Sequence, residues 1–157
     1  IYRVGSSPND TNLIIAGFQD HGLQRLNNAN GNTFWKRWSD NDGTNVIVDH
    51  ANNNIFYGDF FLGVHKKSTN GGLTPQTTFN IQNGIAEQGA IIAPLIMHPE
   101  NSGTLFTSSI AKIYKTTNGG LLWQPIANIP NIITLAIDKS DPNYIYGHAY
   151  DNSTWSF

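Results

Sequence analysis

The sequence contains no cysteine, so neither a disulfide framework nor a thiolate metal site is available to it. Charged residues make up only 13% of the chain and the net charge is −2, so no basic field exists to neutralise a run of phosphates. No apolar run approaches the roughly 20 residues of a membrane-spanning helix. Nucleic acid is therefore excluded as a partner, and no membrane-spanning segment is expected.

Polarity comes instead from Asn, Gln, Ser and Thr together with 15 glycines, which are the residues that build turns between strands. With 39% hydrophobic residues over 157 positions, the chain is long enough to bury a core. The composition favours many short strands.

One repeating unit is an apolar strand, a polar turn, and a second apolar strand that ends in a small residue. It is clearest at residues 46–58, where Val46-Ile47-Val48 is followed by Ile55-Phe56-Tyr57-Gly58. It recurs at residues 95–108 and 135–147, with a degenerate copy at 2–17. The closing small residues Gly17, Gly58, Ser108 and Gly147 are 41, 50 and 39 positions apart.

A second unit, an Asn-Gly turn, follows the first three copies. Its clearest form is Thr116-Thr117-Asn118-Gly119-Gly120-Leu121-Leu122-Trp123; Ser68 to Pro75 is the same turn with Pro in place of Trp, and Asn28 to Trp35 is a weaker copy. The central asparagines Asn30, Asn70 and Asn118 are 40 and 48 positions apart, so two independent motifs share one period.

Four strands in 40 to 50 residues is the spacing of a propeller blade. We predict an all-β fold, a β-propeller fragment of about three to four four-stranded antiparallel blades that form an incomplete ring. Residues 1–157 are one partial domain with approximate blades at 1–40, 41–82, 90–127 and, truncated, 132–157. The glycine-interrupted stretch from Gln82 to Ala93 is a predicted insertion, either loop or short helix.

The turns resemble the Asp-box pattern Ser-x-Asp-x-Gly-x-Thr-Trp of BNR-repeat propellers, with Asn at the Asp position each time. Sialidases, xyloglucanase-like glycoside hydrolases, sortilin-type receptors and photosystem-assembly propellers share this pattern. The segment Gly17-Phe18-Gln19-Asp20-His21-Gly22 is similar to the Gln-Asp-Asn-Gly repeats of secreted bacterial propellers. The resemblance implies the fold and a secreted or cell-surface location, with any export signal outside this segment, but one fold hosts many chemistries.

The Asp-box residues have a structural interpretation. The amide of Asn118 is expected to accept backbone N–H groups two residues on, a following glycine takes positive φ, and Trp123 folds back onto its hairpin. The same structural role is assigned to Asn30, Trp35, Ser68, Asn70, Gly72, Thr116, Asn118, Gly120 and Trp123.

Ligands are expected on the opposite face, which collects the second-to-third loops and the connections between blades. The ligand-binding candidates there are Gln19, Asp20, His21, Trp38, Asp40, Asp42, Asp59, His148, Tyr150 and Asp151. Asp20 and Asp42 are the candidate catalytic carboxylates, because glycoside hydrolysis needs two carboxyl groups that face one bond. The simpler interpretation, which the turn preferences of Asp and Gly favour, is that both are solvated acids in ordinary turns.

No cofactor or metal site is expected. The five histidines are not spaced as the ligands of a metal ion are. The run Asp40-Asn41-Asp42-Gly43 is similar to the start of a calcium loop, but the remaining ligands of such a loop are missing.

Two main function hypotheses remain open, and an assembly factor for a membrane complex is a remote third. The first is a non-enzymatic binding or scaffold segment that recognises protein or glycan through the loop face. The second is a fragment of a xyloglucanase-like or sialidase-like glycoside hydrolase, with Asp20 or Asp42 as acid or base. In both, the rest of the same polypeptide or another chain is expected to complete the propeller.

The predicted open ring has a testable consequence. Fewer than four whole blades leave strand edges and apolar flanks facing water, so residues 1–157 alone are expected to associate or aggregate. Size-exclusion chromatography with light scattering measures this. A stable, cooperative, soluble monomer near 17.3 kDa would contradict the prediction.

Overall fold

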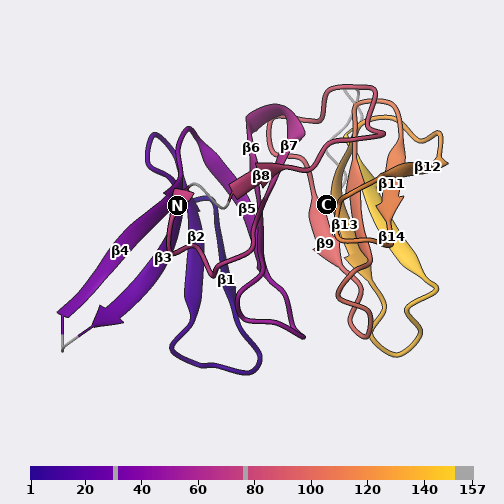
Figure 1. Ribbon diagram of the computed structural model, residues 1–157. Helices are drawn as coiled ribbons and strands as arrows, with labels where there is room; N and C mark the ends of the chain where they lie inside the picture. The colour runs from indigo at the N-terminus through magenta and orange to yellow at the C-terminus, as the bar shows by residue number, and fades with distance from the viewer. Residues whose placement is uncertain (30–31, 76–77, 151–157) are drawn as a thin grey trace.

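The computed structural model describes residues 1–29, 32–75 and 78–150 of the chain, and these residues form a row of antiparallel sheets (Figure 1). The first blade consists of β1 (Arg3–Ser6), β2 (Ile14–Phe18), β3 (Gly22–Ala29) and β4 (Asn32–Ser39). The second consists of β5 (Gly43–Val48), β6 (Phe56–Phe60), β7 (Val64–Ser68) and β8 (Thr78–Asn80). The third consists of β9 (Leu95–Met97), β10 (Leu105–Ser108), β11 (Ile113–Thr116) and β12 (Gln124–Ala127).

A fourth sheet contains β13 (Ile132–Ile137) and β14 (Ile145–Ala149). Each sheet is a meander in which consecutive strands pair, so the order in space is the order in sequence. The described residues form three four-stranded blades and one hairpin and do not close a ring, which confirms the predicted fold class. The one helical element among them is the 3-10 turn η1 (Phe61–Gly63), and residues 82–93 form an irregular connection without a helix.

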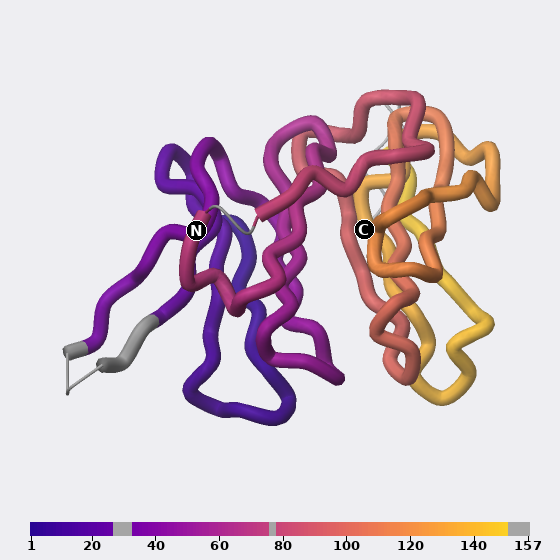
Figure 2. The backbone as a smooth tube through the Cα atoms, viewed as in Figure 1, coloured from indigo at the N-terminus to yellow at the C-terminus, as the bar shows by residue number. Residues whose placement is uncertain are grey.

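The blades stand side by side (Figure 2). The connections from the first to the second blade and from the third blade to the fourth sheet are short, whereas residues 81–94 form a long connection between the second and third blades. In the second and third blades, the second strands β6 and β10 are buried on both faces because their side chains alternate between two neighbouring sheets. Phe56 packs toward the first blade and Tyr57 toward the third. Leu105 and Phe106 divide in the same way between the second and fourth sheets.

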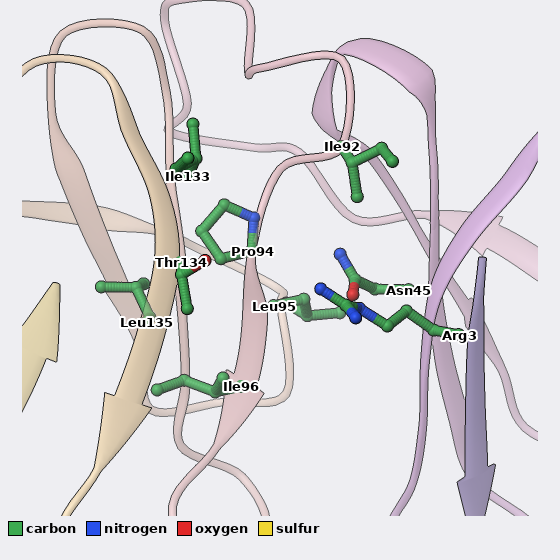
Figure 3. A pocket seen from close by; sticks show the side chains of 9 residues that line it. All are labelled: Arg3, Asn45, Ile92, Pro94, Leu95, Ile96, Ile133, Thr134 and Leu135. Carbon is green, nitrogen blue, oxygen red and sulfur yellow. The ribbon is translucent and has the colours of Figure 1, made fainter. Parts of the chain in front are cut away.

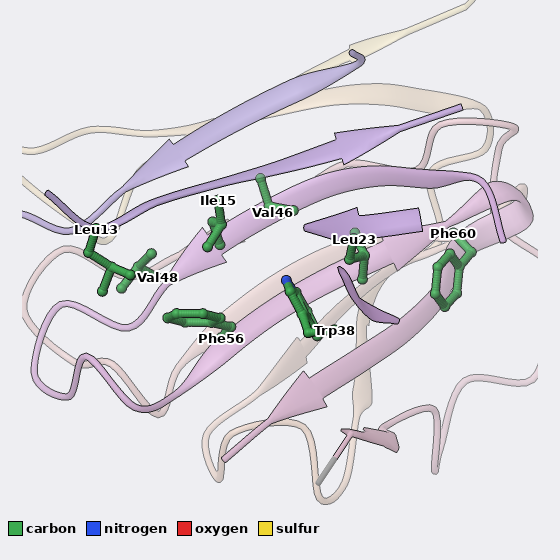
Figure 4. Packing of buried hydrophobic residues seen from close by; sticks show 8 residues of the cluster. All are labelled: Leu13, Ile15, Leu23, Trp38, Val46, Val48, Phe56 and Phe60. Carbon is green, nitrogen blue, oxygen red and sulfur yellow. The ribbon is translucent and has the colours of Figure 1, made fainter. Parts of the chain in front are cut away.

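Three apolar clusters fill the spaces between sheets. Figure 4 shows the first, between the first and second blades, where Trp38 lies against Phe56 with ring centroids 5.9 Å apart. Tyr57, Leu95, Leu105 and other residues form the second cluster between the second and third blades. Phe106, Ile113, Ile132 and Leu135 form the third, between the third blade and the fourth hairpin.

The second strands contain a small residue near their C-terminal end because the neighbouring blade lies very close to the backbone at that position. A Cβ atom on Gly17 would lie 2.2 Å from the carbonyl oxygen of Thr44 in the next blade. A Cβ on Gly58 would lie 2.6 Å from the Leu23 side chain of the preceding blade. A larger residue at either position would force two sheets apart.

The Asn-Gly-Gly turns are closed by two side chains each. In the third blade, the Thr116 hydroxyl accepts the N–H of Gly120 at 3.1 Å, and the Asn118 amide oxygen accepts the N–H of Leu122 at 3.0 Å. Ser68 and Asn70 do the same in the second blade, at Gly72 and Leu73. The expectation that the asparagine accepts an N–H two residues on is therefore wrong: it accepts from three or four residues on. Asn30 lies outside the described residues.

Trp123 packs between blades instead of folding onto its own hairpin, which corrects a second expectation. Its indole N–H donates to the Ile81 carbonyl at 2.6 Å, and its ring lies 5.4 Å from that of His65. Only 1% of Trp123 is exposed. Trp35, in the weaker copy of the motif, is 37% exposed and touches Phe18 edge to face.

These two tryptophans give a matched pair for a stability test. Trp123→Ala is expected to lower the free energy of unfolding by about 3 kcal/mol, because it leaves a cavity between two blades. Trp35→Ala is expected to cost less than about 1.5 kcal/mol, because the ring is partly in water. Urea denaturation followed by circular dichroism measures both, and equal losses would contradict the assignment.

Candidate functional site

The turns and loops divide between two faces, as the meander topology requires. Asn70 and Asn118 lie in the turns between third and fourth strands, whereas Asp20 lies in the β2–β3 turn at the other end of the strands. The second-to-third loops and the connections between blades make up this second face, which we call the loop face.

A hollow of about 280 Å³ opens on the loop face of the second blade. The β4–β5 connection and the ends of β6, β7 and β8 surround it. Its lining residues are Asn41, Asp42, Phe60, Phe61, Val64, Lys66 and Asn80. We call it the loop-face hollow; it brings together one carboxylate, one ammonium, two amides and two aromatic rings.

Asp42 is held in place by the neighbouring turn. The backbone N–H of Asp20 donates to Asp42 Oδ1 at 2.5 Å, so the two predicted catalytic residues do lie together. Both Asp20 (φ 59°) and Asn41 (φ 73°) have left-handed backbone, a conformation that Asp and Asn tolerate better than other non-glycine residues. One oxygen of Asp42 therefore fixes the turn and its side chain is only half-buried.

The aromatic side of the hollow packs against other side chains. Phe60 is buried, and the Lys66 ammonium lies 5.6 Å from the centre of its ring. Phe61 is half-buried and meets Tyr2 edge to face at 5.6 Å. The rings thus present apolar surface beside polar groups, which is the usual composition of a small-molecule site.

Two predicted ligand-binding residues are inaccessible. Trp38 is 0% exposed and packs in the first cluster, so it contacts no ligand. Asp59 lies within β6, not in a loop, and its carboxylate is fully buried 2.5 Å from His65 Nδ1. Burial raises the pKa of Asp59, and the neighbouring His65 opposes that rise. The sequence placed both on the loop face because strand ends are hard to locate from pattern alone.

The remaining candidates are exposed but scattered. Gln19 accepts a hydrogen bond from the Tyr2 hydroxyl at 3.2 Å, and His21 Nδ1 lies 3.1 Å from the Gln19 carbonyl oxygen. Asp40 pairs with Arg37 at 2.8 Å. His148 on β14 and Tyr150 directly after it are exposed and do not line the hollow, and Asp151 lies outside the described residues.

A second cavity, of about 250 Å³, lies where the innermost strands β1, β5, β9 and β13 converge. Figure 3 shows Arg3 and Asn45 on one side of it and Ile133 to Leu135 on the other. Arg3 is the one charged residue in this lining. Sequence reasoning missed the cavity because its walls come from four separate repeats.

The long connection between the second and third blades is tied down by Glu87. Its carboxylate accepts hydrogen bonds from Lys112 Nζ at 2.6 Å, from Ser109 Oγ at 3.3 Å and from the Tyr114 hydroxyl. The hydrogen bond from Lys112, followed by that from Tyr114, lowers the pKa of Glu87. A carboxylate held ionised in this way is a structural anchor and a poor proton donor.

In the part of the chain that the structure describes, no group of three or more His, Asp or Glu residues is arranged to hold a metal ion. Within Asp40-Asn41-Asp42-Gly43, Asp40 pairs with Arg37 and Asp42 with the Asp20 N–H. Among the same described residues, no helix is long and apolar enough to cross a bilayer.

No family model and no curated protein matches the sequence. Solved structures do match. An ancestral GH74 enzyme superposes with a TM-score of 0.71 at 17% identity, over 93% of this chain, and the GH74 enzyme of Niastella koreensis with 0.64 at 16% identity, over 88%. YCF48 from Cyanidioschyzon merolae gives a TM-score of 0.60 at 14% identity, over 96%.

These similar proteins are β-propellers, and at such identities the likeness shows the fold alone. The chain spans 21% and 24% of the length of the two GH74 enzymes and 56% of YCF48.

The Glu87 anchor predicts how the connection responds to pH. Because the folded pKa of Glu87 lies below its ordinary value, the anchor stabilises the fold above that value and is lost as pH falls through the folded pKa. The N–H of Ile110, which donates to the Gln88 carbonyl at 2.9 Å, reports on it. Its hydrogen-exchange protection, corrected for the intrinsic rate, is expected to persist at about pH 5 and to fall toward pH 3.

Glu87→Gln is expected to remove this pH dependence, whereas Glu100→Gln, at an exposed position, is expected to leave it intact. Protection that stays constant between about pH 6 and pH 3 in the unaltered protein would contradict the prediction.

Proposed function

We propose that this chain is a binding segment of a β-propeller and that the loop-face hollow recognises a neutral glycan. The carrying observation is the composition of the hollow: Phe61 offers an apolar ring, while Asn41, Asn80 and Asp42 offer donors and acceptors around it. A pyranose presents the same combination, with an apolar C–H face and a rim of hydroxyl groups. At about 280 Å³ the hollow is near the lower end of the roughly 300–1,000 Å³ of small-molecule sites, a size that suits a short segment of a sugar chain.

Preorganisation supports this role. The backbone around Asp42 is fixed by the Asp20 turn, and Phe60 is fixed by burial in the first cluster. Binding groups that are already held lose little conformational entropy when a ligand arrives. The location that goes with this proposal is the cell surface or the extracellular medium, as the resemblance to secreted bacterial propellers implies.

Glycoside hydrolysis is the second candidate function, favoured by the meeting of Asp20 and Asp42 and by the structural likeness to GH74 enzymes. It requires one of these carboxyl groups to donate a proton and the other to act on the opposite side of the bond. Asp42 already accepts the Asp20 N–H. This hydrogen bond gives Asp42 a structural role in holding the β2–β3 turn, which is independent of any chemical role.

Binding is tested with xyloglucan and cello-oligosaccharides as probes, by isothermal titration calorimetry on the intact polypeptide. Phe61→Ala and Asn80→Ala are each expected to weaken binding about tenfold, since each removes one stacking or hydrogen-bonding contact worth about 1–1.5 kcal/mol. Phe79→Ala is the matched control, because Phe79 is exposed on β8 and does not line the hollow. Equal affinities for Phe61→Ala and the parent protein would contradict the proposal.

The same probes separate the second function. Asp42→Asn keeps an oxygen that can accept the Asp20 N–H but cannot supply a proton. If it abolishes release of reducing sugar and leaves binding intact, the chain is part of a hydrolase. If the parent protein binds the probes and releases no sugar, the binding role stands.

A further inference from the structure

The sequence contains four Asn-Gly pairs, at residues 30–31, 70–71, 83–84 and 118–119. Asparagine is chemically labile in this context, because a glycine has no side chain to hinder attack of its backbone nitrogen on the preceding side-chain amide. Residues 30–31 lie outside the described residues, so the structure compares the other three pairs. It holds them very differently.

In two of the pairs, the glycine nitrogen that would attack is already in use. The N–H of Gly71 donates to the Asn54 carbonyl at 2.6 Å, and the N–H of Gly119 donates to the Gly103 carbonyl at 2.8 Å. Both glycines are buried. The nitrogen must give up its proton before it can form a new bond, so each hydrogen bond opposes the reaction.

The preceding blade holds the same two glycines through their carbonyl groups. Arg25 Nη1 on β3 donates to the Gly71 carbonyl at 2.8 Å, across the interface between the first and second blades. Lys67 Nζ on β7 donates to the Gly119 carbonyl at 3.2 Å, across the interface between the second and third blades. Each glycine is therefore fixed on both sides, and neither can move without disturbing a contact between blades.

The asparagine side chains of these two pairs are fixed as well. Asn70 Oδ1 accepts the N–H of Leu73 at 3.2 Å, and Asn118 Oδ1 accepts the N–H of Leu122 at 3.0 Å. An amide held in this way can turn toward the nitrogen of the next residue only after that hydrogen bond breaks. The turns that build the blades thus shield their own labile pairs.

The third pair, Asn83-Gly84, lies in a turn of a different kind. The N–H of Ile85 donates to the Gln82 carbonyl at 3.0 Å, so Asn83 and Gly84 are the central residues of a β-turn, and Gly84 has φ 94°. Both central residues are exposed, and no acceptor for the Gly84 N–H lies within the part of the chain that the structure describes. The nitrogen that would attack is open to water and base.

This turn also contacts the third blade. Asn83 Nδ2 donates to the Leu121 carbonyl at 3.2 Å, and the Asn83 carbonyl accepts the N–H of Trp123 at 2.8 Å. A Cβ atom on Gly84 would lie 2.1 Å from the Trp123 carbonyl oxygen, so the two backbones are in close contact. The exposed pair is therefore part of the junction between the long connection and the third blade.

We propose that Asn83 is a site of spontaneous deamidation in the folded protein, whereas the fold protects Asn70 and Asn118. The Gly84 nitrogen loses its proton to solvent and bonds to Asn83 Cγ, the Cγ–Nδ2 bond breaks, and the amide nitrogen leaves as ammonia. Water then opens the resulting succinimide at either carbonyl group, which gives aspartate or isoaspartate.

The product weakens the junction with the third blade. A carboxylate at residue 83 has no N–H to donate to the Leu121 carbonyl and places negative charge beside that oxygen. Isoaspartate also adds one carbon to the backbone where it lies against Trp123. Deamidation thus converts a stabilising contact into a repulsive one.

The reaction is tested on the intact polypeptide at mildly alkaline pH, by proteolytic digestion and mass spectrometry of the peptides that contain the three pairs. In the folded protein, Asn83 is expected to deamidate at least about tenfold faster than Asn70 or Asn118, which must first break hydrogen bonds. In concentrated urea, the three pairs are expected to react at similar rates, because only the local sequence then matters. A rate for Asn83 no higher than that for Asn70 and Asn118 in the folded protein would overturn the proposal.

The effect on the junction has its own test. Asn83→Asp reproduces the aspartate product and is expected to lower the melting temperature by about 2–4 °C, since one hydrogen bond is replaced by a repulsion. Asn128→Asp is the matched control: it adds the same charge at an exposed position and is expected to leave the melting temperature unchanged. Equal melting temperatures for Asn83→Asp and Asn128→Asp would show that deamidation does not weaken the junction.

Discussion

The packing of one blade against the next is the constraint on which the rest of this structure depends. A strand has two faces, and a blade between two others must bury both, so the second and third blades carry apolar side chains at consecutive positions. The same requirement limits Gly17 and Gly58 to a hydrogen atom in place of a side chain. It also turns Trp123 away from its own hairpin and into the neighbouring blade. Interior positions that look independent in sequence are therefore coupled in pairs across blade boundaries.

The repeat made the fold readable from sequence. Four strands per repeat, their antiparallel order and the division between turn face and loop face all follow from two motifs with one period, and the structure confirms the fold class. The contact partners of individual side chains could not be predicted from these motifs. Trp123 and the Asn-Gly-Gly turns contact residues about 40 to 50 positions away, and no local pattern specifies which blade surface they meet.

The candidate site was predictable only in part. Asp42 was predicted from sequence and does line the hollow, but Phe60, Phe61, Lys66 and Asn80 join it from other elements. Asp59 shows why the rest failed. An acidic residue next to a glycine resembles a loop residue, yet the alternation in β6 directs it inward to His65, where a buried partner replaces water. Sequence reports the residue's polarity and not the partner that makes burial tolerable.

The direction of the contacts between blades has a consequence for synthesis on the ribosome. Arg25 of the first blade donates a hydrogen bond to the carbonyl of Gly71, which is translated 46 residues later. Lys67 of the second blade donates to the carbonyl of Gly119, which is translated 52 residues later. Each blade can therefore fold before the next one is synthesised and provide the surface on which the next one packs. The fold can grow from the N-terminus without rearrangement of the earlier blades. Premature termination would then yield a stack of ordered blades with one unsatisfied cation at its growing end, a species that cellular quality control has a physical reason to recognise.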